Sequence, residues 1–288
     1  MEEGRIIKLI GGLYTVIGAS GKRLNVKPRG VFRHQEIEPK VGDFVVFDTT
    51  TIHEVKPRKN DLHRPPVANV DQAILIHAAK EPDFSFHLMD RFLVMAEAAD
   101  VNPVIVVTKI DLASDEELRT LKRHLSYYEP HYPVHYTSVK QVATIDAMKR
   151  LIRDKVSVFA GQTGGGKSSV LNALDAELKL KTGDISKALG RGRHTTRHSE
   201  LLFVADGLVA DTPGFSKLDF EGLDAEELRL HYPDFETLSE HCKFRGCQHI
   251  KEPGCAVKKA LDEGKVLASR YENYLLIHEE ISTKKKKY

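Results

Sequence analysis

GQTGGGKS, at residues 161–168, is the most informative segment of this 288-residue chain. It matches the phosphate-binding pattern G-x4-G-K-S. It also follows an expected buried strand, Val156–Ala160, and opens an expected helix at Ser168–Leu174. The glycines let successive backbone N–H groups face an anion, and the helix behind them adds its positive N-terminus. The sequence therefore predicts a nucleoside triphosphate site at the end of a buried strand.

Two residues of this loop have chemistry of their own. Lys167 would reach the β- and γ-phosphates, and the Ser168 hydroxyl would ligate Mg²⁺. The rest of the loop would contact the phosphates mainly through its backbone. The expected phosphate-contacting residues are Gly161, Gln162, Thr163, Gly164, Gly165, Gly166, Lys167, Ser168 and Ser169.

A second phosphate-sensing segment, DTPG at 211–214, follows the apolar run Leu208–Ala210. An aspartate at that strand end can hold Mg²⁺ through water, and the Gly214 backbone N–H can detect the γ-phosphate. A DxxG string is common in ordinary turns, but this one lies about fifty residues after the phosphate loop and ends a strand. We therefore expect Asp211 and Gly214 to face the same triphosphate.

The identity of the base is predicted by TKID at 108–111, which ends the buried run Val104–Val107. The Asp111 carboxylate would accept hydrogen bonds from the guanine N1–H and exocyclic amine. Adenine lacks or reverses these groups, so GTP is favoured over ATP. TSV at 137–139 would support the base through backbone contacts. The expected base-contacting residues are Thr108, Lys109, Ile110, Asp111, Ser138 and Val139.

The order of these motifs differs from that of ordinary GTPases. There the phosphate loop comes first and the base-reading motif last, whereas here TKID and TSV precede the phosphate loop. Ligands of such sheets bind beyond the C-terminal ends of the strands, so rejoining the chain elsewhere leaves the pocket intact. Because strands alternate with helices from residue 66 to 218, we expect a circularly permuted α/β GTPase domain with a mostly parallel sheet.

A glycine- and charge-rich segment at 191–198 is typical of a nucleotide-sensing switch. Thr195 or Thr196 would supply a second hydroxyl ligand to Mg²⁺. Phe215 follows DTPG, at the position where many GTPases carry a water-orienting glutamine. We therefore hypothesise that His194 orients the attacking water and that hydrolysis is slow until a partner orders the loop. A basic loop that contacts rRNA is the alternative interpretation.

Three cysteines and one histidine gather within fourteen residues near the C-terminus. The spacing Cys242-x4-Cys247-x-His249-x5-Cys255 supplies the Cys₃His set of a tetrahedral zinc site, and four protein ligands leave no open position for catalysis. Three cysteines cannot all pair as disulfides. We expect one structural Zn²⁺ that stabilises a small helical region with little core of its own.

The regions that flank the expected GTPase domain are predicted from other signals. Residues 1–65 carry short β-rich runs between glycine turns, which fit a five-stranded OB-type barrel or another small barrel. A polar, proline-bearing stretch at 56–66 separates this unit from the next. Residues 219–288 lose strand character. Helices are expected there near Ala225–Leu230, Ala256–Glu263 and Leu267–Ile281.

Charge distinguishes the ends of the chain from its centre. Residues 1–65 carry twelve Lys and Arg against eight Asp and Glu, residues 66–218 carry nineteen of each, and residues 242–288 carry eleven against six. Two basic flanks around a neutral centre are compatible with a polyanionic partner, although a lysine run such as 284–287 is more often a solvated end.

The overall composition is that of a soluble globular protein, with 41% hydrophobic and 29% charged residues. The N-terminus carries acidic residues where a secretory signal would be basic, and no segment approaches the roughly 20 apolar residues of a membrane helix. We therefore expect a cytoplasmic monomer that does not associate with a membrane.

Taken together, the motifs resemble the ribosome small-subunit-dependent GTPase A family, RsgA, over essentially the whole chain. The resemblance implies an N-terminal OB domain, a permuted GTPase centre and a C-terminal zinc domain. It also implies binding of GTP and GDP, hydrolysis stimulated by the small ribosomal subunit during its late maturation, and contact with its rRNA. Two positions depart from the usual family residues, Gly165 (often valine) and Val139 (usually alanine). The resemblance is carried by TKID at 108–111, GQTGGGKSS at 161–169, RGRHTT at 191–196, DTPGF at 211–215 and the four spaced zinc ligands.

Two other functions fit parts of the pattern. A P-loop ATPase or kinase would share the phosphate loop, but Asp111 argues against it, and comparing GTP with ATP affinity would discriminate. An RNA-binding scaffold, in which the nucleotide only gates attachment, would share the basic flanks. A hydrolysis-dead protein that kept full maturation activity would favour the scaffold.

Overall fold

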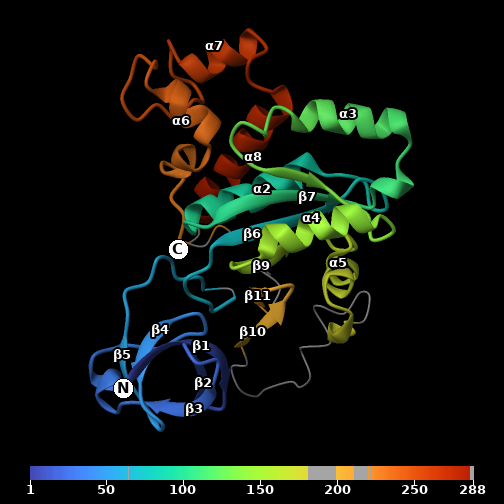
Figure 1. Ribbon diagram of the computed structural model, residues 1–288. Coiled ribbons are helices and arrows are strands. Elements are labelled where there is room, and N and C mark those ends of the chain that lie inside the picture. The colour runs from blue at the N-terminus through green and yellow to red at the C-terminus, as the bar shows by residue number, and fades with distance from the viewer. Residues whose placement is uncertain (64, 181–198, 211–219, 221, 286–288) are drawn as a thin grey trace.

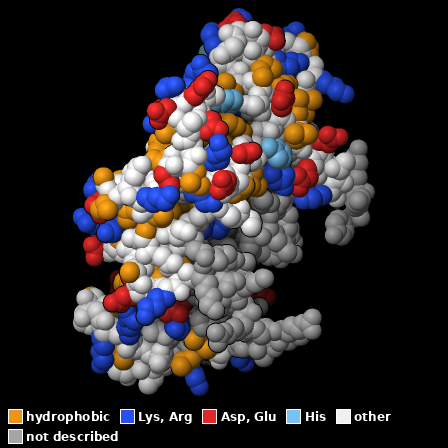
Figure 2. Space-filling view, turned by 90° about the vertical axis from the view of Figure 1, so that its right-hand side faces the viewer, with side chains coloured by type: hydrophobic (Ala, Val, Ile, Leu, Met, Phe, Trp, Pro, Cys, Tyr) orange, Lys and Arg blue, Asp and Glu red, His pale blue; other side chains and the backbone are white. Residues whose placement is uncertain are grey.

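The computed structural model describes residues 1–63, 65–180, 199–210, 220 and 222–285 (Figure 1). A barrel, a central α/β domain and a group of C-terminal helices follow one another along the molecule. In the space-filling view, acidic and basic side chains are interspersed over the visible face, in keeping with a net charge of +2 (Figure 2). None of the described helices is both long and apolar enough to cross a membrane.

The N-terminal unit is the five-stranded barrel that the sequence predicts. Its strands pair in the order β2-β3-β5-β4-β1, and β2 also pairs with β1, which closes the barrel. Side chains alternate between the interior and the surface, so Val16, Val45 and Phe47 are fully buried. Its elements are β1 (Glu2–Ile10), β2 (Leu13–Gly18), β3 (Arg23–Pro28), α1 (Val31–His34), β4 (Phe44–Phe47) and β5 (Thr51–Val55).

The central domain contains a mostly parallel sheet, as expected. Its strands run in the order β10-β11-β9-β6-β7-β8, and only the β10–β11 pair is antiparallel. Its elements are β6 (Gln72–Ala78), α2 (Phe86–Ala98), β7 (Asn102–Thr108), η1 (Ile110–Leu112), α3 (Asp115–Leu125), β8 (Val134–Tyr136), α4 (Val142–Ile152), β9 (Val156–Gly161), α5 (Lys167–Leu174), η2 (Ala176–Leu178), β10 (Ser199–Val204) and β11 (Gly207–Ala210).

Both faces of this sheet are covered, which explains the continuous apolar runs of its strands. One hydrophobic core joins β6, β7 and β9 to α2 and α3 and extends into the barrel. A second core packs α4 and α5 on the opposite face. Every residue of β6 is buried, and Leu75 and Ile76 point into the two different cores.

The barrel and the central sheet are joined by a strand pair that the sequence did not predict. The end of β1 pairs antiparallel with the start of β10, with Lys8 opposite Glu200 and Leu9 opposite Ser199. The Lys8 and Glu200 side chains also form an ion pair at 2.7 Å. The eleven strands therefore follow one another in a single hydrogen-bonded order.

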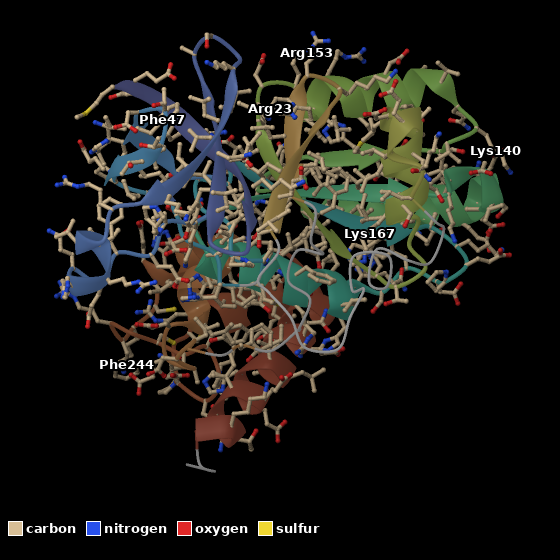
Figure 3. The ribbon with its side chains drawn as sticks, turned by 90° about the horizontal axis from the view of Figure 1, so that it is seen from below. Arg23, Phe47, Lys140, Arg153, Lys167 and Phe244 are labelled. Atoms are coloured by element: carbon tan, nitrogen blue, oxygen red, sulfur yellow. The ribbon has the colours of Figure 1, made fainter. Side chains whose placement is uncertain are left out.

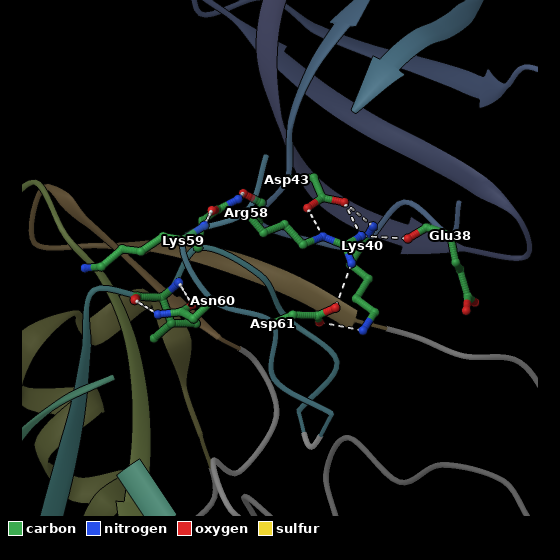
Figure 4. A network of polar contacts seen from close by, with 10 residues as sticks. Glu38, Lys40, Asp43, Arg58, Lys59, Asn60 and Asp61 are labelled. Atoms are coloured by element: carbon green, nitrogen blue, oxygen red, sulfur yellow. Dashed lines mark hydrogen bonds and ion pairs between the residues drawn. The ribbon is translucent and has the colours of Figure 1, made fainter. Parts of the chain in front are cut away.

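The polar stretch between these two units is fixed in place rather than a free spacer (Figure 4). Arg58 donates to both carboxylate oxygens of Asp43, at 2.7 and 2.8 Å, and to Asp61 at 2.7 Å. Asn60 donates to the backbone carbonyls of Val70 and Asp100, both at 2.8 Å. Asp43 is fully buried, so this segment is part of the interface between the barrel and the central domain.

The C-terminal region is helical, but its first helices differ from the expectation. Ala225–Leu230, expected as a helix, is a turn followed by the short 3-10 helix η3 (Leu228–His231). An unpredicted helix, α6 (Pro233–Ser239), begins directly afterwards, because Pro233 lacks an N–H and suits only the first turn of a helix. The last two helices, α7 (Ala256–Asp262) and α8 (Ala268–Lys285), agree with the sequence prediction.

A buried ion network connects these helices to the central domain. Arg270 on α8 donates to Asp90 on α2 at 2.7 Å and to Asp234 on α6 at 3.0 and 3.2 Å. Arg270 and Asp90 are fully buried, and Asn273 donates to the other oxygen of Asp90 at 2.6 Å. For Asp234, burial acts to raise the pKa, but the charge and hydrogen bonds of Arg270 outweigh it and leave that pKa lowered.

Candidate functional site

The base-reading segments and the phosphate loop line one cavity of about 170 Å³. They meet because β7, β8 and β9 are parallel and carry these segments at their C-terminal ends, at one edge of the sheet. The structure thus brings together three motifs that are separate in the sequence, namely TKID, TSV and the phosphate loop. The cavity is lined by Thr108, Lys109, Asp111, Leu112, Thr137, Val139, Lys140, Gly166, Ser169 and Val170.

The first residue of TKID contacts the phosphate loop directly. The buried hydroxyl of Thr108 donates a hydrogen bond to the backbone carbonyl of Gly165. The same hydroxyl also donates a longer hydrogen bond, of 3.3 Å, to the backbone carbonyl of His77 on β6. The threonine of TKID therefore ties this segment to the phosphate loop, in addition to its predicted contact with the base. Ile110, the third residue, begins η1 and packs against the core.

The glycines of the phosphate loop are required by its geometry. Gly161, Gly164 and Gly166 have φ values of +127°, +76° and +92°, which other residues rarely adopt. A Cβ on Gly161 would lie 2.0 Å from the carbonyl oxygen of Ile76 on β6. At Gly165 a Cβ would lie 2.9 Å from the Gln162 carbonyl oxygen, so this loop is packed too tightly for a larger residue without a shift.

Lys167 begins α5 and holds its ammonium group over the loop (Figure 3). Its Nζ donates to the carbonyls of Gly161 at 2.9 Å and Gln162 at 3.0 Å. Burial lowers the pKa of Lys167 from its ordinary value. A phosphate oxygen would be a stronger acceptor than either carbonyl, because hydrogen bonds between charged partners are the stronger kind. The neighbouring Ser168, the expected Mg²⁺ ligand, is 7% exposed.

Asp111 is held as an oriented anion. Ser138 donates its hydroxyl to Oδ1 at 2.7 Å, and the Lys140 ammonium lies 2.7 Å from Oδ2. Hydrogen bonds from Lys140 and then from Ser138 lower the pKa of Asp111. Its carboxylate is therefore stabilised in the charged form, which can only accept hydrogen bonds. Lys109 adopts a left-handed backbone conformation, with φ of 53°, and donates its ammonium to the carbonyl of Glu81.

Lys140 is a site residue that the sequence analysis missed. It lies beside Asp111 and lines the same cavity, and its backbone N–H donates to the Ser138 hydroxyl at 3.1 Å. The available signal was its position directly after TSV, in the same loop between β8 and α4. Val139 itself is 48% exposed at the mouth of the cavity.

Five predicted residues lie outside the part of the chain that the structure describes. They belong to the switch segment and to DTPG, and their predicted roles in Mg²⁺ binding, γ-phosphate sensing and water orientation therefore stay predictions. These residues are His194, Thr195, Thr196, Asp211 and Gly214.

The four expected zinc ligands meet in the C-terminal region. The sulfurs of Cys242, Cys247 and Cys255 and a ring nitrogen of His249 all lie within 4.8 Å of one another. Burial raises the pKa of the Cys247 thiol to about 12, so holding it as a thiolate requires a cation beside it. Three soft sulfurs and one imidazole in a closed cluster are the donor set that suits Zn²⁺.

A hydrogen-bond chain fixes the ring orientation of His249. The Ser239 hydroxyl donates to the carbonyl of Phe235 at 2.7 Å, so it accepts from the His249 Nε2–H at 3.0 Å. The unprotonated Nδ1 then faces the sulfurs, 3.3 Å from Cys255 Sγ and 3.7 Å from Cys242 Sγ. Ser239 was not predicted from the sequence. It selects the tautomer that can ligate a metal.

The chain is similar to known proteins over its full length. It matches the family models "RsgA GTPase" at residues 55–221 and "RsgA N-terminal domain" at residues 3–54. Proteins named small ribosomal subunit biogenesis GTPase RsgA are 50% identical in Geobacillus sp. (strain WCH70) and 49% identical in Shouchella clausii (strain KSM-K16), each over 100% of both chains.

Two solved structures share the fold. The crystal structure of YloQ, titled a circularly permuted GTPase, aligns with a TM-score of 0.85 and 41% identity over 100% of this chain and 97% of its own. That of YjeQ from Thermotoga maritima aligns with a TM-score of 0.87 and 36% identity, over 97% and 98% of the two chains. The reversed motif order predicted from the sequence agrees with the first of these structures.

Proposed function

Because the chain belongs to the RsgA family of circularly permuted GTPases, we propose that it hydrolyses GTP to GDP and phosphate during biogenesis of the small ribosomal subunit. The single observation that carries this proposal is the shared cavity in which Asp111, Lys140, Gly166 and Ser169 meet. The presence of a base-reading carboxylate and a phosphate-holding loop in one cavity is explained if a single guanine nucleotide contacts both.

The described residues would act on GTP as follows. Asp111 accepts from the guanine N1–H and amine, and Ser138 keeps the carboxylate oriented for that contact. The backbone N–H groups of the phosphate loop and the ammonium of Lys167 hold the β- and γ-phosphates. Positioning and charge stabilisation account for most of the catalysis of phosphoryl transfer, so these contacts are central to the reaction.

Magnesium would neutralise charge that develops on the phosphates. Ser168 would hold it together with Asp211 and with Thr195 or Thr196. We further propose that Gly214 senses the γ-phosphate and that His194 orients the attacking water, since Phe215 cannot do so through a hydrogen bond. A partner that orders the switch segment would then accelerate hydrolysis.

The flanking regions would supply binding to the subunit and its rRNA. We propose domain boundaries at 1–65, 66–218 and 219–288, with the barrel and the zinc-binding region on either side of the GTPase domain. The basic balance of residues 1–65 and of residues 242–288 supports a polyanionic partner. One Zn²⁺ would hold the C-terminal fold together. The protein would act as a cytoplasmic monomer.

The test is the GTPase rate of the full chain with and without purified small ribosomal subunits. We expect strong stimulation by small subunits, little by large subunits, and no hydrolysis of ATP in either case. A Lys167→Ala protein serves as the control and should stay inactive under all conditions. Equal rates with and without small subunits would refute the proposed coupling, and equal use of ATP would refute the role of Asp111.

A further inference from the structure

An aromatic side chain is exposed on the loop between the first two cysteines of the zinc site. This loop reads Cys242-Lys-Phe-Arg-Gly-Cys247. Phe244 is 45% exposed, although the other aromatic rings nearby, such as Phe235 and Tyr274, are fully buried. Phe244 lies at the periphery of the C-terminal helices, far from Lys167 (Figure 3). It therefore contributes neither to the hydrophobic core nor to the nucleotide site.

The loop is held in position at both ends. Its two flanking cysteines belong to the zinc-ligand cluster. The backbone N–H of Lys243 also donates to the carbonyl of Gly254 at 3.1 Å, and Gly246 makes a turn with φ of +72°. These contacts hold the backbone of the loop in a conformation that leaves the Phe244 ring exposed. An aromatic group that is already presented to solvent binds a partner at a small entropic cost.

The segment of sequence from Cys242 to Lys259, which contains Phe244, is rich in basic residues. Between residues 242 and 259 there are five Lys and Arg but one acidic residue. That residue, Glu252, directs its carboxylate at the backbone N–H groups of Gln248, Ile250 and Lys251, at 2.7 to 3.0 Å. Its charge is therefore compensated locally. The ammonium of Lys243 lies 5.5 Å from the centre of the Phe244 ring.

We infer that Phe244 stacks on an unpaired base of RNA while Lys243 and Arg245 contact the adjoining phosphates. An aromatic ring can stack on any base, and the cations next to it in the sequence, Lys243 and Arg245, can contact phosphates. An aromatic anchor for a protein pocket would instead be expected among apolar neighbours. The inference rests on the proposed association with ribosomal RNA and names the kind of contact that the zinc-binding region would make.

The chain offers a direct optical test, because it contains no tryptophan. Phe244→Trp introduces a single indole at the stacking position. Titration with a single-stranded oligouridylate should quench its fluorescence in a saturable manner, since a stacked base quenches indole emission. An RNA duplex of the same length should leave the emission unchanged. Leu276→Trp, at a 54% exposed position of α8 between Glu272 and Glu280, is the matched control and should show no quenching.

Affinity for purified small subunits provides the second measurement. Phe244→Ala should weaken binding by about tenfold or more, which corresponds to the loss of one stacked base. Phe244→Trp should keep full affinity, and Phe244→Leu should be as weak as Ala because it retains apolar area but cannot stack. Zinc content and the basal GTPase rate should be unchanged in all three variants.

Each outcome has a defined meaning. Wild-type affinity of the Ala variant, or no quenching of Phe244→Trp by single-stranded RNA, would overturn the inference while leaving the proposed function intact. Full affinity of the Leu variant would show an apolar contact with a ribosomal protein instead. If small subunits failed to bind or stimulate the wild-type protein, the proposed function itself would fail, and oligouridylate quenching would still decide whether Phe244 stacks.

Discussion

The hydroxyl of Thr108 donates a hydrogen bond to the backbone carbonyl of Gly165, 57 positions later in the chain. This bond joins the motif that we propose reads the base to the loop that we propose holds the phosphates. Their order in the sequence is reversed relative to ordinary GTPases, but β7 and β9 flank β6 in one parallel sheet, so both motifs emerge at the same edge. The contact shows how a permuted chain rebuilds an undivided nucleotide pocket.

Removing that hydroxyl should loosen the pocket. Thr108→Val keeps the shape of the buried side chain but leaves the Gly165 carbonyl without its donor, at a cost of about 1–3 kcal/mol. We expect several-fold weaker GDP binding, measured by titration calorimetry, together with a lower melting temperature. Thr108→Ser, which retains the hydroxyl, is the control. Equal affinities of the Val and Ser variants would contradict the role given to this bond.

A single methyl group should disable the phosphate loop. In Gly161→Ala the new Cβ would lie 2.0 Å from the Ile76 carbonyl, at a φ of +127° that alanine rarely adopts. The loop must then move away from β6, and we expect a loss of more than about 2 kcal/mol of stability and of measurable GTP binding.

The control is Gly12→Ala in the barrel, where φ is also positive, at +80°, but no atom lies within 4 Å of the added Cβ. That substitution should cost about 1 kcal/mol and leave nucleotide binding unchanged. If both variants bound GTP like the wild type, the close approach of the loop to β6 would be wrong.

The ion network at Arg270 should be the most sensitive part of the joint between the central domain and the C-terminal helices. Arg270→Met leaves Asp90 and Asp234 buried without their cation, and loss of one partner in such a network costs about 3–5 kcal/mol. Lys284→Met removes the exposed ion pair with Glu280 and should cost at most about 1 kcal/mol. Denaturant unfolding measures both changes.

The loss of unfolding free energy in Arg270→Met should depend on pH. Without the guanidinium, burial raises the pKa of both aspartates above their values in the unfolded chain, as it already does for Asp90. A carboxyl group with a raised pKa in the folded state is least destabilising below its unfolded pKa and most destabilising once pH exceeds its folded pKa. The difference in unfolding free energy between the variant and the wild type should therefore become smaller as pH falls toward 4, which is near the pKa of aspartate in the unfolded chain. A gap independent of pH would contradict the buried placement of these carboxylates.

The zinc site should depend on Ser239 although it is not a ligand. Ser239→Ala removes the acceptor for the His249 Nε2–H, so the ring loses the contact that directs Nδ1 at the sulfurs. We expect zinc affinity to fall by about 10- to 100-fold, measured by competition with a chromogenic chelator. Ser282→Ala, which removes a hydroxyl near His278 away from the cluster, should bind zinc normally. Unchanged affinity in Ser239→Ala would refute this role.

Local patterns predicted much of this fold because they depend on neighbouring residues. The buried run at Val156–Ala160, the glycines that follow it and the Cys/His spacing each specify a local geometry, and the structure contains all three. The helix expected at Ala225–Leu230 is instead a turn followed by η3, and the α-helix of this region begins only at Pro233, a residue that suits the first turn of a helix.

Contacts between distant segments were not predictable in the same way. Arg270 reads as an ordinary charged residue of a helix, and its burial depends on two aspartates 36 and 180 positions away. The pairing of Lys8 with Glu200, and the role of Ser239, depend equally on how separate elements pack. Lys140 could most readily have been predicted, since it directly follows TSV, which was already predicted to contact the base.

The most direct test of the account is the nucleotide preference of an Asp111→Asn protein. Xanthine carries a carbonyl where guanine carries its exocyclic amine, so an asparagine amide can donate where the aspartate accepted. Titration calorimetry with GDP, ADP and XDP should show that the wild type strongly prefers GDP. The Asn variant should lose GDP affinity by about a hundredfold or more and gain XDP. If Asp111→Asn bound GDP as tightly as the wild type does, the carboxylate at position 111 would not face the base, and the shared pocket would be refuted.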